Sequence, residues 1–499
     1  MSWYGALSLM MGGLVVLLAL GVPVAFAFIA INVAGALLFM GGEAGLGQLV
    51  RNFADAVTKN ELAPIPLFIL MGELMYRSRM AGHAIDAVDR LIARVPGRLA
   101  VVAVTGGTIF SALSGSTIAT TAMLGNTMLP DMLKRGYKPV MAMGPIMAIG
   151  GVDMLIPPSA LTVLLATLAS GVSTARMPVA DLLIAGILPG LIMSVMFITY
   201  IIGRCALDPR LAPVQAVVPL PHGIARPRPI VALSALAIAV AAAATSGWWI
   251  AMLAWLVAVA VGIAIRCLGS WSYARWYWLT WGPTLLYVVP LFVIMLVVIG
   301  SIFAGIASPT DSAALGCSAT VLVALAYRSL SLRALITALV ETALVTVMIF
   351  FIIGASVSFA QIISLSGATE GALGEIGKLP FSRFEFILCM IVILLILGCF
   401  VDQVSMMLLT LPFFMPLVAQ LGIDPVWFGC LFLISMQIGL LSPPFGLLLF
   451  VMKGVAPPET TLAQISRAAA PFIMLMLVTL VLVLSVPGIA TWMPGLISR

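Results

Sequence analysis

Residues 150–158 read GGVDMLIPP and residues 439–444 read GLLSPP, and these two stretches decide the fold of the chain. Each lies inside a long apolar segment, 138–171 for the first and 425–455 for the second. A pair of prolines removes helix hydrogen bonds, and the glycines free the backbone. We therefore expect two discontinuous helices, each broken in its interior.

The composition around these stretches is too apolar for a soluble protein. Of the 499 residues, 63% are hydrophobic and 8% are charged, and the mean hydropathy is +1.21. A soluble domain carries about 25% charged residues, so the main solvent must be lipid, and a water-filled catalytic domain is excluded. The formal charge of +6 does not indicate a nucleic-acid partner, because the basic residues are scattered. The six cysteines show no paired spacing, which argues against a disulfide framework or a metal site.

Apolar runs long enough to cross about 30 Å of hydrocarbon predict membrane spans. They lie at 4–20, 23–41, 62–76, 180–203, 229–246, 248–267, 284–305, 309–327, 340–364 and 464–494. No basic residue precedes the first run, so we expect it to be retained rather than cleaved as a signal.

Two further apolar regions, 97–136 and 380–424, are interrupted near the middle by polar residues. Each is compatible with two full spans or with a re-entrant hairpin of two half-length helices. If both are hairpins, 18 Lys and Arg fall on one side and 6 on the other, at 51, 59, 176, 378, 383 and 499. The positive-inside rule makes the richer side cytoplasmic and places the second hairpin on the opposite face.

A single offset of 286 residues relates the two halves of the chain. It places Ser116 on Asp402. It also pairs prolines and glycines of the two halves: Pro23 and Pro309, Pro130 and Pro416, Gly136 and Gly422, Pro139 and Pro425, Pro157 and Pro443, Pro158 and Pro444. We expect a first inverted repeat over 1–203 and a second over 284–499. A linker over 204–283 would hold two extra transmembrane helices, whose role stays open between bracing, docking and a lipid-facing aromatic belt.

Inverted repeats with paired broken helices are typical of secondary transporters. A helix broken at mid-membrane exposes N–H groups at one end and carbonyls at the other, so anions suit the first and Na⁺ suits the second. Gly and Pro are also common in ordinary membrane helices, and Ser and Thr there often bond only the backbone. The repetition of tips and breaks at one spacing favours a site over this structural interpretation.

Several motifs resemble those of the large membrane subunit (M) of tripartite ATP-independent periplasmic (TRAP) transporters. They are PLFILMGEL at 66–74, SGSTIAT at 114–120, MLPDMLKRGY at 128–137, LIPPS at 155–159, GIASPTDSAA at 305–314 and GLLSPPFG at 439–446. The resemblance covers about 1–203 and 284–494 and implies an all-α polytopic membrane protein of the elevator type. It also implies a Na⁺-coupled importer, a symporter of organic acid anions, in the bacterial inner membrane.

The same resemblance implies separate partners, a small membrane (Q) subunit and a periplasmic substrate-binding (P) protein. Na⁺ would be the coupling ion, with no other metal, no cofactor and no enzymatic activity. The nearest rival is a stand-alone ion-coupled carboxylate symporter that needs no binding protein. A structural subunit is less favoured because the tip-and-break motif occurs twice. A membrane enzyme is least favoured, since no nucleophile–base set or metal-ligand cluster is found.

Carried over by position, the resemblance implies two Na⁺ sites and one substrate site. The sodium ligands would come from each hairpin tip and the break beside it: Ser114, Gly115, Ser116, Gly150, Gly151 and Asp153 in the first, and Asp402, Ser405, Gly439 and Ser442 in the second. The substrate would lie between the two tips, at Ser116, Thr117, Thr120, Pro157, Asp402, Gln403 and Pro443. No Lys or Arg falls in this set, so anion binding should depend on Na⁺.

Asp153 and Asp402 fall at the expected middle of the membrane, where an unpaired carboxylate costs at least about 2.5–3.5 kcal/mol. For Asp402 we favour a site role over a purely structural helix cap. Asp153 stands where the family usually has glycine, and three roles stay open: Na⁺ ligand, proton-carrying group, or acceptor for N–H groups at the tip. Ser308 and Asp311 predict a capping box at the start of the helix over 309–327.

Overall fold

The computed structural model describes residues 2–78, 95–114, 117–157, 159–172, 176–213, 293–302, 306–327, 329–376, 378 and 380–497. Throughout these ranges the regular structure is helical, and no strand occurs in them. The extra segments expected at 229–246 and 248–267 lie outside the described residues, as do Gly115 and Ser116 at the first hairpin tip.

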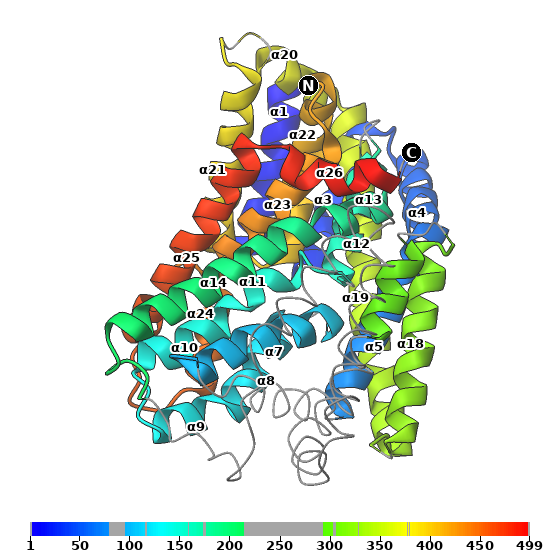
Figure 1. The fold of residues 1–499 in the computed structure, drawn as a ribbon. Coiled ribbons are helices and arrows are strands. Elements are labelled where there is room, and N and C mark those ends of the chain that lie inside the picture. The colour runs from blue at the N-terminus through cyan, green and yellow to red at the C-terminus, as the bar shows by residue number, and fades with distance from the viewer. Residues whose placement is uncertain are drawn as a thin grey trace, which may run out of the picture.

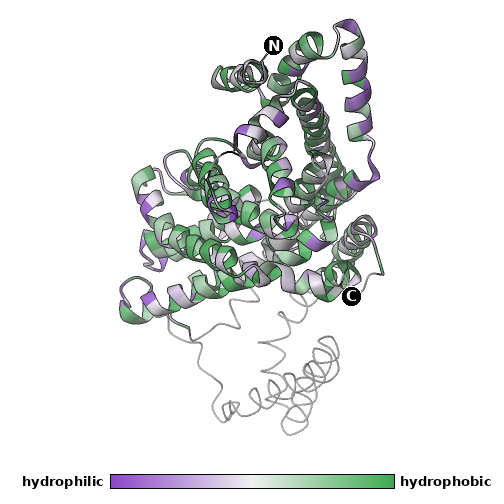
Figure 2. Cartoon of the chain, turned by 90° about the horizontal axis from the view of Figure 1, so that it is seen from above, coloured by the Kyte–Doolittle hydropathy of each residue, from purple (hydrophilic) through white to green (hydrophobic). Residues whose placement is uncertain are grey.

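Several described helices are long and apolar enough to cross a membrane. They are Val179–Leu207, Pro309–Ala326, Leu332–Leu365, Gln403–Gln420 and Leu462–Ser485. Hydrophobic residues cover most of the ribbon, and hydrophilic ones are sparse (Figure 2). This distribution agrees with the multi-pass membrane protein that the composition predicts.

The N-terminal part consists of short helices joined by tight turns: α1 Trp3–Leu7, the π-helical turn η1 Ser8–Gly12, α2 Gly13–Ala19, α3 Val24–Phe39, α4 Glu43–Val57, the 3₁₀ turn η2 Asn60–Leu62 and α5 Pro64–Arg77. The spans expected at 4–20, 23–41 and 62–76 correspond to α1 to α2, α3 and α5. α4 was not among the expected spans, because its charged residues interrupt the apolar run.

The matching part of the second repeat holds α18 Pro309–Ala326, α19 Leu332–Leu365 and α20 Ala368–Ile376. Ser308 and Asp311 form the predicted capping box at the start of α18, with reciprocal side-chain and backbone hydrogen bonds. α18 packs on α5 and α19 packs on α3, so helices of each repeat contact helices of the other repeat in a symmetric way.

Each predicted hairpin region contains two helical arms, and in the second region residues 399–402 separate them. The first comprises α7 Arg98–Ser114, α8 Thr117–Thr127 and α9 Leu129–Lys134, and the second comprises α21 Arg383–Gly398 and α22 Gln403–Gln420. α8 and α9 lie near the lower end of the molecule in Figure 1, whereas α20 and α22 lie near the upper end.

The two broken helices also lie where the sequence places them. The first comprises α10 Pro139–Ala148, α11 Gly150–Asp153 and α12 Ala160–Val172, and the second comprises α23 Pro425–Leu441 and α24 Leu447–Val455. The offset of 286 residues that pairs the prolines also pairs the starts of α8 and α22 and those of α10 and α23. α12 packs on α22 and α24 packs on α8, so each second half contacts the other repeat's hairpin.

Of the two segments that follow the broken helices, the first agrees with the expected single span and the second differs from it. The run expected at 180–203 is one helical span, Val179–Leu207, in which Gly186 separates α13 Val179–Ala185 from α14 Ile187–Leu207. A Cβ at Gly186 would lie 2.2 Å from the carbonyl oxygen of Leu155, so only glycine permits this approach. The run at 464–494 was expected as one span but forms α25 Leu462–Ser485 and α26 Gly488–Ile497. The chain turns there because Pro487 forces the preceding residue away from helical geometry.

Candidate ion and substrate site

The first hairpin tip contacts the first helix break directly. Thr117, the first residue of α8, donates a hydrogen bond from Oγ1 to Oδ2 of Asp153 at 2.9 Å. A Cβ at Gly150 would lie 2.5 Å from Cγ2 of Thr117, so glycine is what allows α8 and α11 to approach this closely. Thr117 and the break at 150–153 are therefore neighbours in the structure.

This first contact is closed to solvent. Asp153 is 1% exposed and Thr117 is 2% exposed, and Thr120 and Thr121 beside them on α8 are fully buried. The Asp153 carboxylate meets α8 at its N-terminus, where the helix dipole favours negative charge. A carboxylate and several hydroxyls thus surround one buried position between α8 and α11.

The chain after Asp153 is fixed by side chains of the following helix. Oγ1 of Thr162 donates to the carbonyl of Met154 at 2.5 Å, and Oγ of Ser159 accepts from the backbone N–H of Thr162 at 3.4 Å. These bonds fix the interrupted stretch between α11 and α12 against the first turn of α12.

The second tip is organised differently. Asp402 is the N-cap of α22, and its Oδ2 accepts from the backbone N–H groups of Val404 at 3.1 Å and Ser405 at 3.2 Å. The hydroxyl of Ser405 donates to Oδ1 of the same carboxylate. Asp402 is exposed and Ser405 is buried. The helix cap is therefore present, and whether Asp402 also holds an ion stays a prediction.

The second break packs on the first arm of its hairpin. A Cβ at Gly439 would lie 2.5 Å from Cα of Gly398 on α21, so the two backbones cross in contact there. Oγ of Ser442 donates to the carbonyl of Ile438 at 2.7 Å. In the described part of the chain, the hydrogen bonds of Asp402 stay within its own turn and do not reach Ser442 or Gly439.

The second tip nevertheless reaches the first break. Nε2 of Gln403 lies 3.7 Å from Sδ of Met154, the residue that follows Asp153. Of the other substrate candidates, Pro157 is buried and Pro443 is exposed. The structure thus brings Thr117, Asp153 and Gln403 into one neighbourhood.

One buried polar residue escaped the sequence reasoning. Gln437 in α23 is fully buried, and neither Oε1 nor Nε2 has a hydrogen-bond partner among the described residues. A lone amide in an apolar helix was the available signal, because a buried polar group without a partner is costly. The offset of 286 residues pairs Gln437 with Gly151 at the first break.

The chemistry of these donors is that of a hard cation. Within the described ranges, no three His, Cys, Asp or Glu residues gather as they would around a transition metal. Hydroxyls, backbone carbonyls and a single carboxylate per repeat are oxygen donors, which suit hard metal ions. The first site therefore has a donor set compatible with Na⁺.

Comparison with known proteins identifies the family. The sequence model described as "Tripartite ATP-independent periplasmic transporter, DctM component" matches residues 11–489. The "C4-dicarboxylate TRAP transporter large permease protein DctM" of Pseudomonas aeruginosa is 29% identical over 437 residues, covering 87% of this chain and 86% of the relative. The "Ectoine/5-hydroxyectoine TRAP transporter large permease protein UehC" of Ruegeria pomeroyi is 28% identical and covers 97% of both chains.

Solved structures show the same type of fold. The YdaH transporter of Alcanivorax borkumensis has a TM-score of 0.59 at 14% identity, covering 91% of this chain and 90% of that one. MtrF of Neisseria gonorrhoeae, described with a class of antimetabolite efflux pumps, has a TM-score of 0.53 at 12% identity, covering 90% and 85%. The family match, together with the apolar helices, shows that the chain is a multi-pass membrane protein and belongs to the DctM family, the large permease component of TRAP transporters.

Proposed function

We propose that this chain is the membrane-spanning subunit of a Na⁺-coupled importer of organic acid anions. The observation that carries the proposal is the buried contact between Thr117 at the first hairpin tip and Asp153 at the first break. It places a carboxylate and hydroxyls at the end of α8, and Na⁺ bound there would offset the cost of the buried charge.

The first Na⁺ site would be formed by Asp153, Thr117, the backbone of the break at Gly150 and Gly151, and the tip residues 114–116. The second would be formed by Asp402 and Ser405 with the backbone around Gly439 and with Ser442. In the second site the carboxylate already caps α22, so an ion there would use the lone pairs that the cap leaves available.

The substrate would bind between the two tips, at Ser116, Thr117, Thr120, Pro157, Asp402, Gln403 and Pro443. The contact between Gln403 at the second tip and Met154 at the first break supports a single substrate position between the tips. Helix N-termini, hydroxyls and co-bound Na⁺ would hold the anion. Relatives are named for C4-dicarboxylates, ectoines and, in Oleidesulfovibrio alaskensis, isethionate, which supports a small organic acid as the substrate class.

Transport would follow an elevator movement of the two hairpins and broken helices against the remaining helices. α12 contacts the second hairpin and α24 contacts the first, and these contacts support a unit that moves as one body. The positions of α9 and α22 toward opposite ends of the molecule support re-entrant hairpins of opposite orientation (Figure 1). The partners would be a small membrane subunit and a periplasmic binding protein in the bacterial inner membrane.

The test is uptake into proteoliposomes. The chain would be reconstituted with its small subunit, and uptake of labelled succinate, ectoine and isethionate would be measured with the matching binding protein and an inward Na⁺ gradient. We expect uptake that requires both Na⁺ and the binding protein. Uptake by this chain alone would favour the stand-alone symporter, and uptake that is equal with K⁺ in place of Na⁺ would contradict the coupling.

A further inference from the structure

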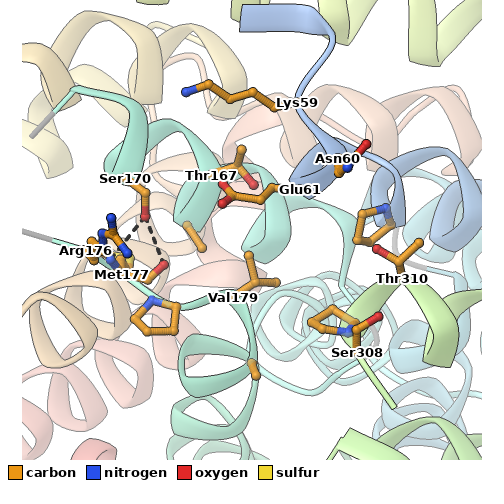
Figure 3. A pocket seen from close by; sticks show the side chains of 15 residues that line it. Lys59, Asn60, Glu61, Thr167, Ser170, Arg176, Met177, Val179, Ser308 and Thr310 are labelled. Atoms are coloured by element: carbon orange, nitrogen blue, oxygen red, sulfur yellow. Dashed lines mark hydrogen bonds between the residues drawn. The ribbon is translucent and has the colours of Figure 1, made fainter.

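A cavity of about 950 Å³ lies between two connectors of the first repeat and the start of α18. The connector between α4 and α5 contributes Lys59, Asn60 and Glu61, and the connector leading into α13 contributes Arg176. Figure 3 shows these side chains around the cavity, with Thr310 of α18 on the same side as Asn60 and across from Arg176. The cavity is distinct from the hairpin tips, because none of the tip residues lines it.

The basic residues of this cavity are unusual for their position in the chain. Lys59 and Arg176 are two of the six Lys and Arg that the charge distribution places on the non-cytoplasmic side. Both are exposed, and they come from connectors more than 100 residues apart in the sequence. A face with little basic charge therefore concentrates two cations at one cavity.

Local contacts hold both cations near the cavity. Oγ of Ser170 donates to the carbonyl of Met177 and accepts from its N–H, each at 3.1 Å, which fixes the chain beside Arg176 (Figure 3). Nζ of Lys59 lies 4.0 Å from the position that a Cβ at Gly171 would take. This places the ammonium over the last turn of α12, where the helix dipole attracts a cation.

The remaining lining residues suit a carboxylate. Asn60 and Thr310 supply neutral donors, and Glu61 supplies one negative charge against the two positive charges. The cavity is thus net positive, which attracts an organic anion.

The cavity depends on a feature that only the first repeat has. The connector at 58–63 interrupts the helix between α4 and α5, whereas α19 runs without a break through the equivalent positions of the second repeat. Repeat symmetry alone therefore does not produce this cavity, and the sequence of the connector supplies two of its three charges.

We propose that this cavity is an access site that binds an organic acid through its carboxylate, with Lys59 and Arg176 as the anion ligands, before the anion reaches the hairpin tips. The inference rests on the proposed import function. Because the charges here are fixed side chains, binding in this cavity does not need Na⁺, whereas binding at the tips does.

The test measures protection of a cysteine in the cavity wall. Thr310→Cys is introduced in the full chain, the purified protein is treated with the anionic thiol reagent 2-sulfonatoethyl methanethiosulfonate, and labelling of residue 310 is quantified by peptide mass spectrometry. The measurement is made in Na⁺-free buffer with potassium succinate, against potassium chloride of equal ionic strength. Ala180→Cys on α13 is a second reporter in case the first fails to fold.

We expect succinate to slow labelling by up to about fivefold relative to chloride, the upper end of what an exposed charge pair contributes. Lys59→Gln and Arg176→Gln should each remove the protection, and Glu61→Gln should extend it to lower succinate concentrations. Arg51→Gln is the matched control, because Arg51 is exposed on the same expected face and does not line the cavity.

Equal labelling in succinate and chloride would overturn the proposal, as would protection that persists in both the Lys59→Gln and Arg176→Gln variants. The two proposals can fail separately. Protection without Na⁺-driven uptake would contradict the import function and support this site, whereas Na⁺-driven uptake without protection would contradict this site alone.

Discussion

The two repeats place their carboxylates on opposite sides of the same arrangement. In the first repeat Asp153 lies in the helix break and meets a hydroxyl at the hairpin tip. In the second repeat Asp402 lies at the tip, and the position equivalent to Asp153 is Gly439. Each repeat thus keeps one acid near its tip and break, but the acid has changed places with an uncharged residue.

The exchange changes what each carboxylate does. Asp153 is 1% exposed and joins two elements that are 36 residues apart, from α8 to α11. Asp402 is exposed and bonds within the first turn of its own helix. A carboxylate between elements ties their positions together, whereas a carboxylate within one turn stabilises only that turn. The first site is therefore expected to couple ion binding to packing more strongly than the second.

Asp153→Ala should have the largest effect. It removes a hydrogen bond to a charged group, a contribution of about 1.5–3 kcal/mol, and it removes the carboxylate proposed to bind Na⁺. We expect a lower Tm of the purified protein in detergent and loss of the Tm increase on adding Na⁺. Asp153→Asn is the matched control, because it keeps a hydrogen-bond acceptor without the charge and should lose only the Na⁺ response. A full Na⁺ response in Asp153→Ala would show that Asp153 is structural.

Gly439→Ala should have the next largest effect, since the added Cβ would overlap Cα of Gly398 on a crossing backbone. Overpacking of this kind costs about 1–3 kcal/mol, which a lower Tm would reveal. Gly454→Ala on α24 is the control, because nothing lies within 4 Å of its added Cβ. Equal Tm values for the two variants would mean that α21 and α23 can move apart without cost.

Asp402→Ala should have a moderate effect on stability, about 1 kcal/mol from the lost helix cap. If Asp402 also binds Na⁺, the Na⁺ dependence of uptake should weaken much more than the Tm falls. Asp402→Asn separates the two roles, because Asn caps helices as well as Asp but carries no charge. If reconstituted Asp402→Asn shows wild-type Na⁺ activation of uptake, Asp402 serves only as the helix cap.

Gln437→Leu should have the smallest effect on stability. The amide has no partner among the described residues, so an apolar side chain of similar size should be neutral or stabilising by up to about 1 kcal/mol. Ser435→Ala serves as the comparison, because the Ser435 hydroxyl bonds the carbonyl of Leu431 in the same helix. A clear fall in Tm for Gln437→Leu would show that the amide has a partner beyond the described residues.

The sequence predicted those parts of the fold that covalent chemistry dictates. Pro157 and Pro443 mark the two breaks because each begins a proline pair, which removes helix hydrogen bonds, and Pro139 and Pro425 begin the helices before them. Pro487 carried the same information about the end of α25, but the apolar run on both sides concealed it. α4 was missed because an amphipathic helix does not have the uniform hydropathy of a membrane span.

The site was predicted less completely, because side-chain partners depend on how distant segments pack. The sequence predicted that the first tip and the first break form one site. The hydrogen bond of Thr117 to Asp153, however, needs the close approach that Gly150 permits. The cap at Asp402 was readable, since Asp is a preferred N-cap residue, and the site role was favoured over it. Gln437 escaped because its burial depends on helices far away in the sequence.

The uninterrupted course of α19 has a mechanical consequence. Its 34 residues form one continuous helix, whereas α4 and α5 are separate helices joined by a connector. The two halves of the molecule share one plan but differ in the continuity of this helix, and the charged cavity with Lys59 lies at the interrupted one. A change in the tilt of α4 against α5 would widen or narrow that cavity while α19 keeps its length and direction.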